Sequence, residues 1–269
     1  MDLTPLTSPA PGHWRTVATP DWCNPRGGLW GGYPIGLFTR VLEAEPTATG
    51  EPLSITMTYA AQLPAGELDI RTRCLRQGRS IGVWAVEMSE AGRHEVAVQG
   101  MVTMAVRPDV PGFAFASMPD APAPETLAAV TPPIGTLHPS VSLFERRPLD
   151  PLPPRPTGEA RTLSWIRSRQ APLDKAILGM MTDTSPPRAM YAVEGITLST
   201  TLSLTVYLHA SAAELAEVGE DFVLVDYDGR VGTGGASDER SNYWRRDGKL
   251  LATSEQLAWY RTGTPSQPG

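Results

Sequence analysis

The sequence predicts an α+β fold built from two similar halves, each with one helix packed against an antiparallel sheet. Residues 200–261 repeat the spacing and chemistry of residues 52–107, and an apolar segment with helical spacing precedes each copy. About half of the prolines lie between residues 108 and 156. A repeat of this length that occurs twice indicates two fused units, because a solenoid needs three or more copies to bury a continuous core.

In the first half, one helix is expected before a series of strands. Residues 34–42 carry apolar side chains at helical spacing, and Pro34 suits the first turn of a helix. Apolar runs separated by short turns that contain glycine then predict strands at residues 53–62, 67–77, 80–90 and 95–106. Turns this short join antiparallel neighbours, so we expect a meander that packs on the helix.

The second half repeats this order after a proline-rich segment. We expect a strand at 165–169, a helix at 172–183 and further strands at residues 200–210, 222–231, 236–246 and 250–261. Because proline has no amide hydrogen for a helix or a sheet, residues 108–157 are predicted to be a linker. It divides an N-terminal unit, residues 1–107, from a C-terminal unit, residues 158–262, and residues 263–269 are predicted to be a disordered tail.

Composition and charge argue against several classes of protein. The net charge of -6 does not suit the broad basic surface that nucleic acid requires. No apolar run approaches the ~20 residues that span a bilayer, and the N-terminus has no signal-peptide pattern. We therefore expect a cytoplasmic protein without a membrane partner. Cys23 and Cys74 have neither metal-ligand nor disulfide spacing, so a zinc cluster is not expected. We expect no metal and no redox cofactor.

Several short motifs, in their order along the chain, resemble those of the acyl-CoA thioesterase II family. They are NPRGG at 24–28, RQGRS at 76–80, TD at 182–183, TLSLT at 201–205 and SEQ at 254–256. The resemblance implies a double hotdog fold, in which each of two fused hotdog units is a long helix packed on a curled antiparallel sheet. It also implies a hydrolase of fatty acid metabolism that cleaves acyl-CoA, or related acyl, thioesters.

The same resemblance implies a catalytic site in the second half. In that family a water molecule is held by an Asp near the end of the second-half helix, a Thr that opens the next strand and a Gln on the final strand. The matching residues are Asp183, Thr201 and Gln256, with Asp183 activating the water. The first half has Pro52 and Gly100 at the corresponding positions of Thr201 and Gln256, so it is expected only to complete the sheet and the acyl tunnel.

The choice between Thr200 and Thr201 depends on the register of the strand, because successive side chains point to opposite faces. We expect one face of this strand to be apolar and to pack on the helix, formed by Leu202, Leu204, Val206 and Leu208. This pattern places Thr201 on the other face and favours its hydroxyl over that of Thr200. A carboxyl with an ordinary pKa of about 3.9 is a weak base, but burial in an apolar tunnel raises the pKa of such a group.

Other functions stay open at this stage. Asn24–Pro25 suits an enoyl-thioester hydratase on the same fold, although no His follows to pair with Asp21. A protein that only binds acyl thioesters has the same fold-level signature, and Asp183 also suits a helix end or turn. The sequence does not determine the length of the acyl group, the thiol carrier or the pathway. Association of such units into a homo-oligomer is compatible with the sequence.

Overall fold

The computed structural model describes residues 6–130, 138–150, 152 and 158–263. The N-terminal half contains one α-helix and a short 3-10 helix, Pro20–Trp22. Its elements are β1 (Thr7–Ala10), β2 (His13–Ala18), α1 (Gly32–Ala44), β3 (Glu51–Tyr59), β4 (Gly66–Gln77), β5 (Ile81–Glu90) and β6 (Val98–Ala105).

The C-terminal half has more elements, and the connection to it contains the 3-10 helix Pro124–Thr126. The α-helices are α2 (Pro139–Ser142), α3 (Lys175–Met181) and α4 (Ala212–Val218), and Arg188–Tyr191 form a 3-10 helix. The strands are β7 (Phe144–Pro148), β8 (Thr162–Ser168), β9 (Ile196–Leu208), β10 (Val223–Asp228), β11 (Gly232–Thr233), β12 (Ala236–Trp244) and β13 (Leu250–Thr262).

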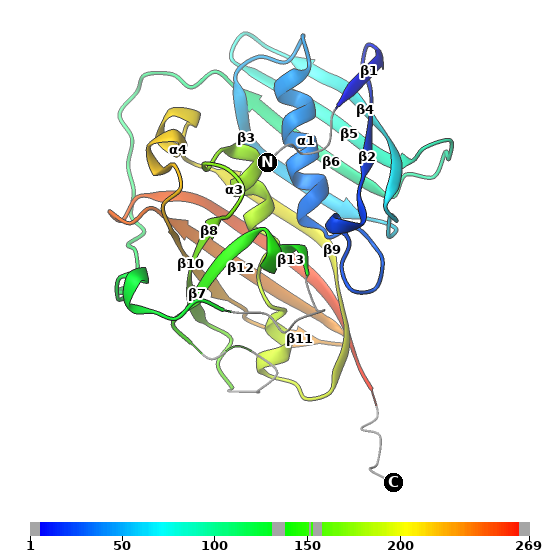
Figure 1. The fold of residues 1–269 in the computed structure, drawn as a ribbon. Coiled ribbons are helices and arrows are strands. Elements are labelled where there is room, and N and C mark those ends of the chain that lie inside the picture. Colours follow the sequence, from blue (N-terminus) through cyan, green and yellow to red (C-terminus); the bar gives the residue numbers. More distant parts are fainter. Residues whose placement is uncertain (1–5, 131–137, 151, 153–157, 264–269) are drawn as a thin grey trace.

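Within the described residues the strands form one 13-stranded sheet in which neighbours run antiparallel. Its order is β1-β2-β4-β5-β6-β3-β9-β13-β12-β10-β8-β7, and β11 pairs with β12 (Figure 1). The two halves meet where β3 pairs with β9, with Thr56 opposite Thr205 at the centre of the paired segment. The predicted meanders are thus joined edge to edge into a single layer.

Helices α1 and α3 lie side by side and cover the sheet around the β3–β9 junction (Figure 1). They approach closely because Gly179 has no side chain; a Cβ there would lie 2.9 Å from Ile35 Cγ2. Helix α1 is apolar and buried nearly all round, as expected for a helix enclosed between a sheet and other elements. On β9, the buried side chains of Leu204, Val206 and Leu208 alternate toward the helices.

Helix α3 has 7 residues and is shorter than the helix predicted at 172–183. Of the two long helices that the resemblance implies, α1 is therefore the long one, with 13 residues. Asp174 ends the extended segment before α3 and caps the helix, because its side chain accepts a hydrogen bond from the Ile177 amide. At the other end, the Thr182 hydroxyl donates to the Gly179 carbonyl, and residues 182–183 form a turn. This turn is what carries Asp183 away from the helix.

Part of the proline-rich segment 108–157 forms regular structure, including the strand β7. Phe144 is buried on β7, which pairs with β8, whereas Phe113 and Phe115 are 85% and 91% exposed. Residues 131–137, 151 and 153–157 of this segment, and 264–269 of the predicted tail, lie outside the described residues. None of the helices in the described ranges is long and apolar enough to cross a bilayer.

Candidate active site

Asp183 lies where the end of α3 meets the beginning of α1. Its amide donates to the Met180 carbonyl, which continues the last turn of α3, and its own carbonyl accepts a hydrogen bond from Trp30 Nε1 at 2.9 Å. The backbone amide of Gly32 at the start of α1 donates to its carboxylate. The partial positive charge at a helix N-terminus favours a negative group at this position.

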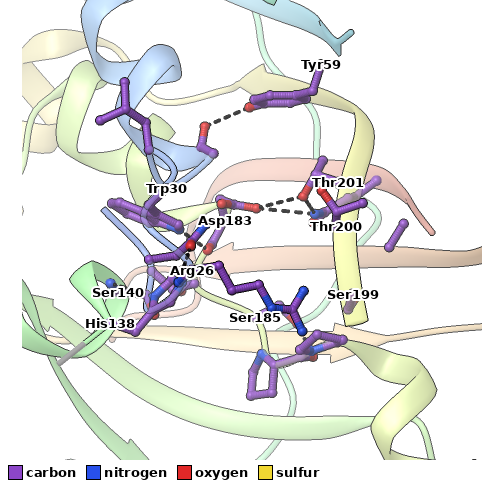
Figure 2. Close-up of a pocket in the computed structure, with 18 of the residues that line it drawn as sticks. Arg26, Trp30, Tyr59, His138, Ser140, Asp183, Ser185, Ser199, Thr200 and Thr201 are labelled. Atoms are coloured by element: carbon purple, nitrogen blue, oxygen red, sulfur yellow. Dashed lines mark hydrogen bonds between the residues drawn. The ribbon is translucent and has the colours of Figure 1, made fainter. Parts of the chain in front are cut away.

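The structure brings the three residues singled out in the sequence into direct contact, and Figure 2 shows Asp183 beside Thr201. Gln256 Nε2 lies 2.5 Å from Thr201 Oγ1 and 3.2 Å from Asp183 Oδ1. The Thr201 hydroxyl donates to the same Asp183 oxygen at 3.4 Å. Three elements that are distant in sequence therefore supply a carboxylate, a hydroxyl and an amide within one hydrogen-bonded group.

A β-bulge at Leu202 positions the Thr201 side chain. Along β9 and β13, Gln256 pairs with Leu204 and Leu257 with Ser203, but Ala258 pairs with Thr201. Leu202 has no partner on β13, so the side chains on the two sides of the bulge alternate in opposite senses. Thr201 therefore points toward the helices, on the same face of the sheet as Leu204. The choice of Thr201 over Thr200 is therefore supported by its contacts, but its predicted position on the face away from the helix is wrong.

Burial raises the pKa of Asp183 to about 7, while the hydrogen bonds from Gln256, Thr201 and the Gly32 amide act in the opposite direction. Burial is the largest cause because it disfavours the charged form of a carboxyl. A carboxyl with this pKa is partly ionised at neutral pH and can both accept and return a proton there.

The first half supplies residues that sequence reasoning did not assign to the site. A Cβ on Gly31 would lie 2.9 Å from Asp183 Oδ2, so glycine leaves the space that the carboxylate occupies. The Tyr59 hydroxyl donates to the Gly31 carbonyl at 2.7 Å and fixes this turn. Trp30, which is buried, also holds Asp183 through its hydrogen bond to the Asp183 carbonyl. The Gly31–Gly32 pair just before Pro34 was the available signal, since adjacent glycines often allow close approach.

The first half does not repeat this arrangement. The symmetric pairing of Thr56 with Thr205 makes Pro52 the counterpart of Thr201 and Ile55 the counterpart of Leu204. Ile55 pairs with Val102, so Val102 and not the predicted Gly100 corresponds to Gln256. The prediction of Gly100 came from aligning the turns at Gly92 and Gly248, but the register of the strands differs by two residues from that alignment.

The three side chains open into a cavity of about 590 Å³, a volume in the range of small-molecule sites. Its wall combines apolar residues from both halves, among them Leu29, Pro34, Leu63, Val98, Val141 and Ala258. Ionisable residues also line it: Arg26, His138, Arg146, Asp183 and Glu239. Burial raises the pKa of Glu239 to about 7 and lowers that of His138 to about 4.

The Asn24 side chain accepts a hydrogen bond from the Arg26 amide within a turn, and Asn24 also lines the cavity. Cys23 and Cys74 are free cysteines. Across the described ranges, no group of three or more His, Cys, Asp and Glu side chains is arranged to hold a metal ion.

Comparisons with solved structures identify the fold. A protein of unknown function with a hot dog fold from Alicyclobacillus acidocaldarius is 24% identical, with a TM-score of 0.90 over 98% of each chain. A putative thioesterase II from Thermobifida fusca is 18% identical, with a TM-score of 0.79 over 96% of each chain. An acyl-CoA thioesterase II from Mycobacterium marinum is 17% identical, with a TM-score of 0.74 over 97% of this chain and 98% of that chain. A search of curated proteins gave no significant match.

Family models cover nearly the whole chain. Residues 19–105 match the N-terminal domain of acyl-CoA thioesterases, and residues 114–260 match the C-terminal domain. The two matches follow one another in the same order as the two halves of the sheet. The chain therefore belongs to the acyl-CoA thioesterase family and is a thioesterase with a hotdog fold.

Proposed function

We propose that this thioesterase hydrolyses acyl-CoA, or related acyl thioesters, to the free acid and thiol with water activated by Asp183. The observation that carries the proposal is the contact of Asp183, Thr201 and Gln256 beside a cavity of about 590 Å³. A pKa near 7 suits a general base at neutral pH, because the ionised form is then populated and still basic.

The reaction needs a nucleophile, a proton acceptor and a leaving group. The water oxygen attacks the carbonyl carbon of the thioester while Asp183 accepts its proton, and Thr201 and Gln256 orient the water through their hydrogen bonds. The tetrahedral intermediate then breaks its C–S bond, and the proton held by Asp183 goes to the departing sulfur. The products are a carboxylic acid and a free thiol, and Asp183 is again ionised.

We further infer that the chain is a double hotdog, with one unit in residues 1–107 and the other in residues 158–262. Each unit has a central helix on an antiparallel sheet, which supports this division. The C-terminal unit supplies the reacting groups, while Trp30 and Gly31 of the N-terminal unit hold Asp183 from the other side. Neither unit has a complete site without the other.

Replacement of the site residues tests this function. Asp183→Asn is expected to lower kcat/KM for an acyl-CoA by about 10²- to 10³-fold, because it removes the base. Thr201→Val and Gln256→Leu should each reduce it by about tenfold or more, measured as thiol release over a panel of acyl-CoAs. Thr205→Val is the matched control, since Thr205 lies on the same strand and its hydroxyl donates to the Thr56 hydroxyl at the junction of β3 and β9.

Two outcomes would reject the proposal in favour of the alternatives. If the natural protein and Asp183→Asn both release thiol at the uncatalysed rate, the protein binds acyl thioesters without hydrolysing them. Loss of the double-bond absorbance of crotonyl-CoA without release of thiol would indicate an enoyl-thioester hydratase.

A further inference from the structure

Arg146 places a buried guanidinium in the wall of the same cavity. Its side chain extends from β7, is 8% exposed and donates from Nη2 to the carbonyl oxygen of Thr184. The guanidinium carbon lies 5.6 Å from the centre of the Tyr227 ring. Among the described residues, no carboxylate lies within 4.0 Å of it, whereas the neighbouring Arg147 is paired with Glu145 at 2.7 Å.

A buried arginine without an anionic partner is costly, because the guanidinium loses its hydration and gains no opposite charge. The contact with Thr184 uses one nitrogen of a group that carries five N–H donors. The other nitrogens of Arg146 are not among the fully buried polar atoms that lack a partner. Arg146 is one of the residues that line the cavity.

The position of the guanidinium relates it to the proposed reaction. Thr184 directly follows Asp183, so Arg146 contacts the residue next to the proposed base. We place the thioester carbonyl at Asp183, with the charged coenzyme directed to the solvent and the acyl group directed into the cavity that Arg146 lines. A group a few carbons along the acyl chain is then within reach of Arg146.

The electrostatics of this part of the cavity favour an anion. After burial, the positive charge of Arg146 is the second cause that lowers the pKa of His138. Glu239 is the other buried carboxyl in the wall, and it accepts a hydrogen bond from the backbone amide of Arg188 instead of pairing with Arg146. Because burial raises the pKa of Glu239 to about 7, a large fraction of it is uncharged at neutral pH.

We propose that Arg146 binds a carboxylate at the far end of the acyl group, and that the preferred substrates are thioesters of dicarboxylic acids. A guanidinium binds a carboxylate through two parallel hydrogen bonds, which gives both affinity and orientation. This inference rests on the proposed thioester hydrolysis at Asp183. The distal carboxylate takes no part in that step: water adds to the thioester carbonyl, the C–S bond breaks, and the products are a dicarboxylate and a thiol.

Matched substrates that differ only at the far end of the acyl group test this proposal. Thiol release is measured with glutaryl-, adipoyl- and suberyl-CoA and with pentanoyl-, hexanoyl- and octanoyl-CoA of the same chain lengths. The natural enzyme should show a higher kcat/KM for the dicarboxylic member of at least one pair. Arg146→Met should lower that member's kcat/KM by roughly 10- to 100-fold, the usual effect of losing a hydrogen bond to a charged group, and leave its partner nearly unchanged.

Arg147→Met is the matched control, because Arg147 lies on the same strand and is paired with Glu145 outside the cavity wall. Arg147→Met should leave unchanged the ratio of the kcat/KM values for the dicarboxylic and the monocarboxylic substrate. The proposal is overturned if the natural enzyme prefers the monocarboxylic member at every length, a result that needs no variant to fold. The proposal is also overturned if Arg146→Met lowers kcat/KM by the same factor for both substrates of a pair. If no acyl-CoA is hydrolysed in a manner that depends on Asp183, the proposed function itself fails.

Discussion

Two effects on the pKa of Asp183 oppose each other. Burial of the carboxyl raises the pKa, and the hydrogen bonds that stabilise the carboxylate lower it. Because burial has the larger effect, its pKa lies at about 7 and its ionised form becomes dominant only above neutral pH. We therefore expect kcat/KM to rise with pH and to level off above about pH 7, since the base must be ionised to accept a proton. Rates of thiol release measured from pH 5 to 9 give this profile.

The control for this profile is Glu239, whose pKa is also about 7 and which lines the same cavity. Glu239→Gln should retain the rise with pH if Asp183 is responsible for it. A flat profile in Glu239→Gln would assign the titration to Glu239 and contradict the role of Asp183 as the base.

The raised pKa of Asp183 also predicts a cost in stability. A carboxyl whose pKa is raised by folding contributes stability below its unfolded value, near 3.8, and this contribution is lost as the pH rises toward 7. Asp183→Asn should therefore be more stable than the natural protein at pH 8, by about 3 °C or more in Tm. The difference should be mostly lost near pH 4, where the folded-state carboxyl is protonated and the unfolded-state carboxyl is about half protonated. Thermal unfolding at the two pH values decides this, and equal Tm values at pH 8 would show that the carboxylate is not destabilised.

At the scale of elements, the course of the strands was predictable and their irregularities were not. The strands of both halves follow from alternating apolar residues, such as Leu204 and Val206, which pack on the helices. The bulge at Leu202 has no signature in the sequence, because it depends on how β9 aligns with β13. Helix α4 did have a signal that was overlooked, the capping box of Ser211 and Glu214.

The site residues from the second half were found through family resemblance, whereas those from the first half depend on packing between elements. The Gly31–Gly32 pair indicates that some group approaches the backbone closely, but it does not indicate that this group is a carboxylate 152 positions later, at Asp183. The contact arises because α1 begins where α3 ends, an arrangement that follows only from the docking of the two helices. Local sequence patterns do not encode contacts of this kind.

The start of α1 gives a test at this scale. Gly31→Ala should lower kcat/KM by about tenfold or more, because the new Cβ would lie 2.9 Å from Asp183 Oδ2 and displace the carboxylate. Backbone strain is not the cause, since Gly31 has a φ of -63° that alanine adopts readily. Gly112→Ala is the control, because no atom lies within 4 Å of its added Cβ. Full activity of Gly31→Ala would mean that the position of Asp183 is not fixed by this turn.

For the whole molecule, the sheet is nearly symmetric but its chemistry is not. At the counterpart of the Thr201 position, the Pro52 carbonyl accepts a hydrogen bond from Lys175 Nζ, and Lys175 is 1% exposed. Lys175 also donates to the Ala210 carbonyl and is paired with Glu51. The second symmetric position is therefore occupied by a buried cation that contacts both halves, and the contact of a carboxylate, a hydroxyl and an amide is found at the first position, that of Thr201.

The halves should stay together without a covalent connection, because their interface is built from the interior of the sheet. Strand β3 pairs with β9 from Ser54 to Thr58, α1 packs on α3, and the Arg107 guanidinium donates to carbonyls of Leu208, His209 and Ala210. A protease site inserted between Gly112 and Phe113 lies in exposed chain outside the sheet. After cleavage, both fragments should elute together on gel filtration and keep kcat/KM within about twofold of the uncut protein.

The uncut insertion variant and the natural protein treated with the same protease are the controls for this experiment. If the fragments separate while each stays folded, the β3–β9 junction is weaker than its hydrogen bonds indicate. If they remain associated but lose activity, the connection itself holds the site together, which would contradict a site assembled by α1, α3, β9 and β13. Retained activity after cleavage would support a site that depends on both units and on the sheet between them, and not on the chain that links them.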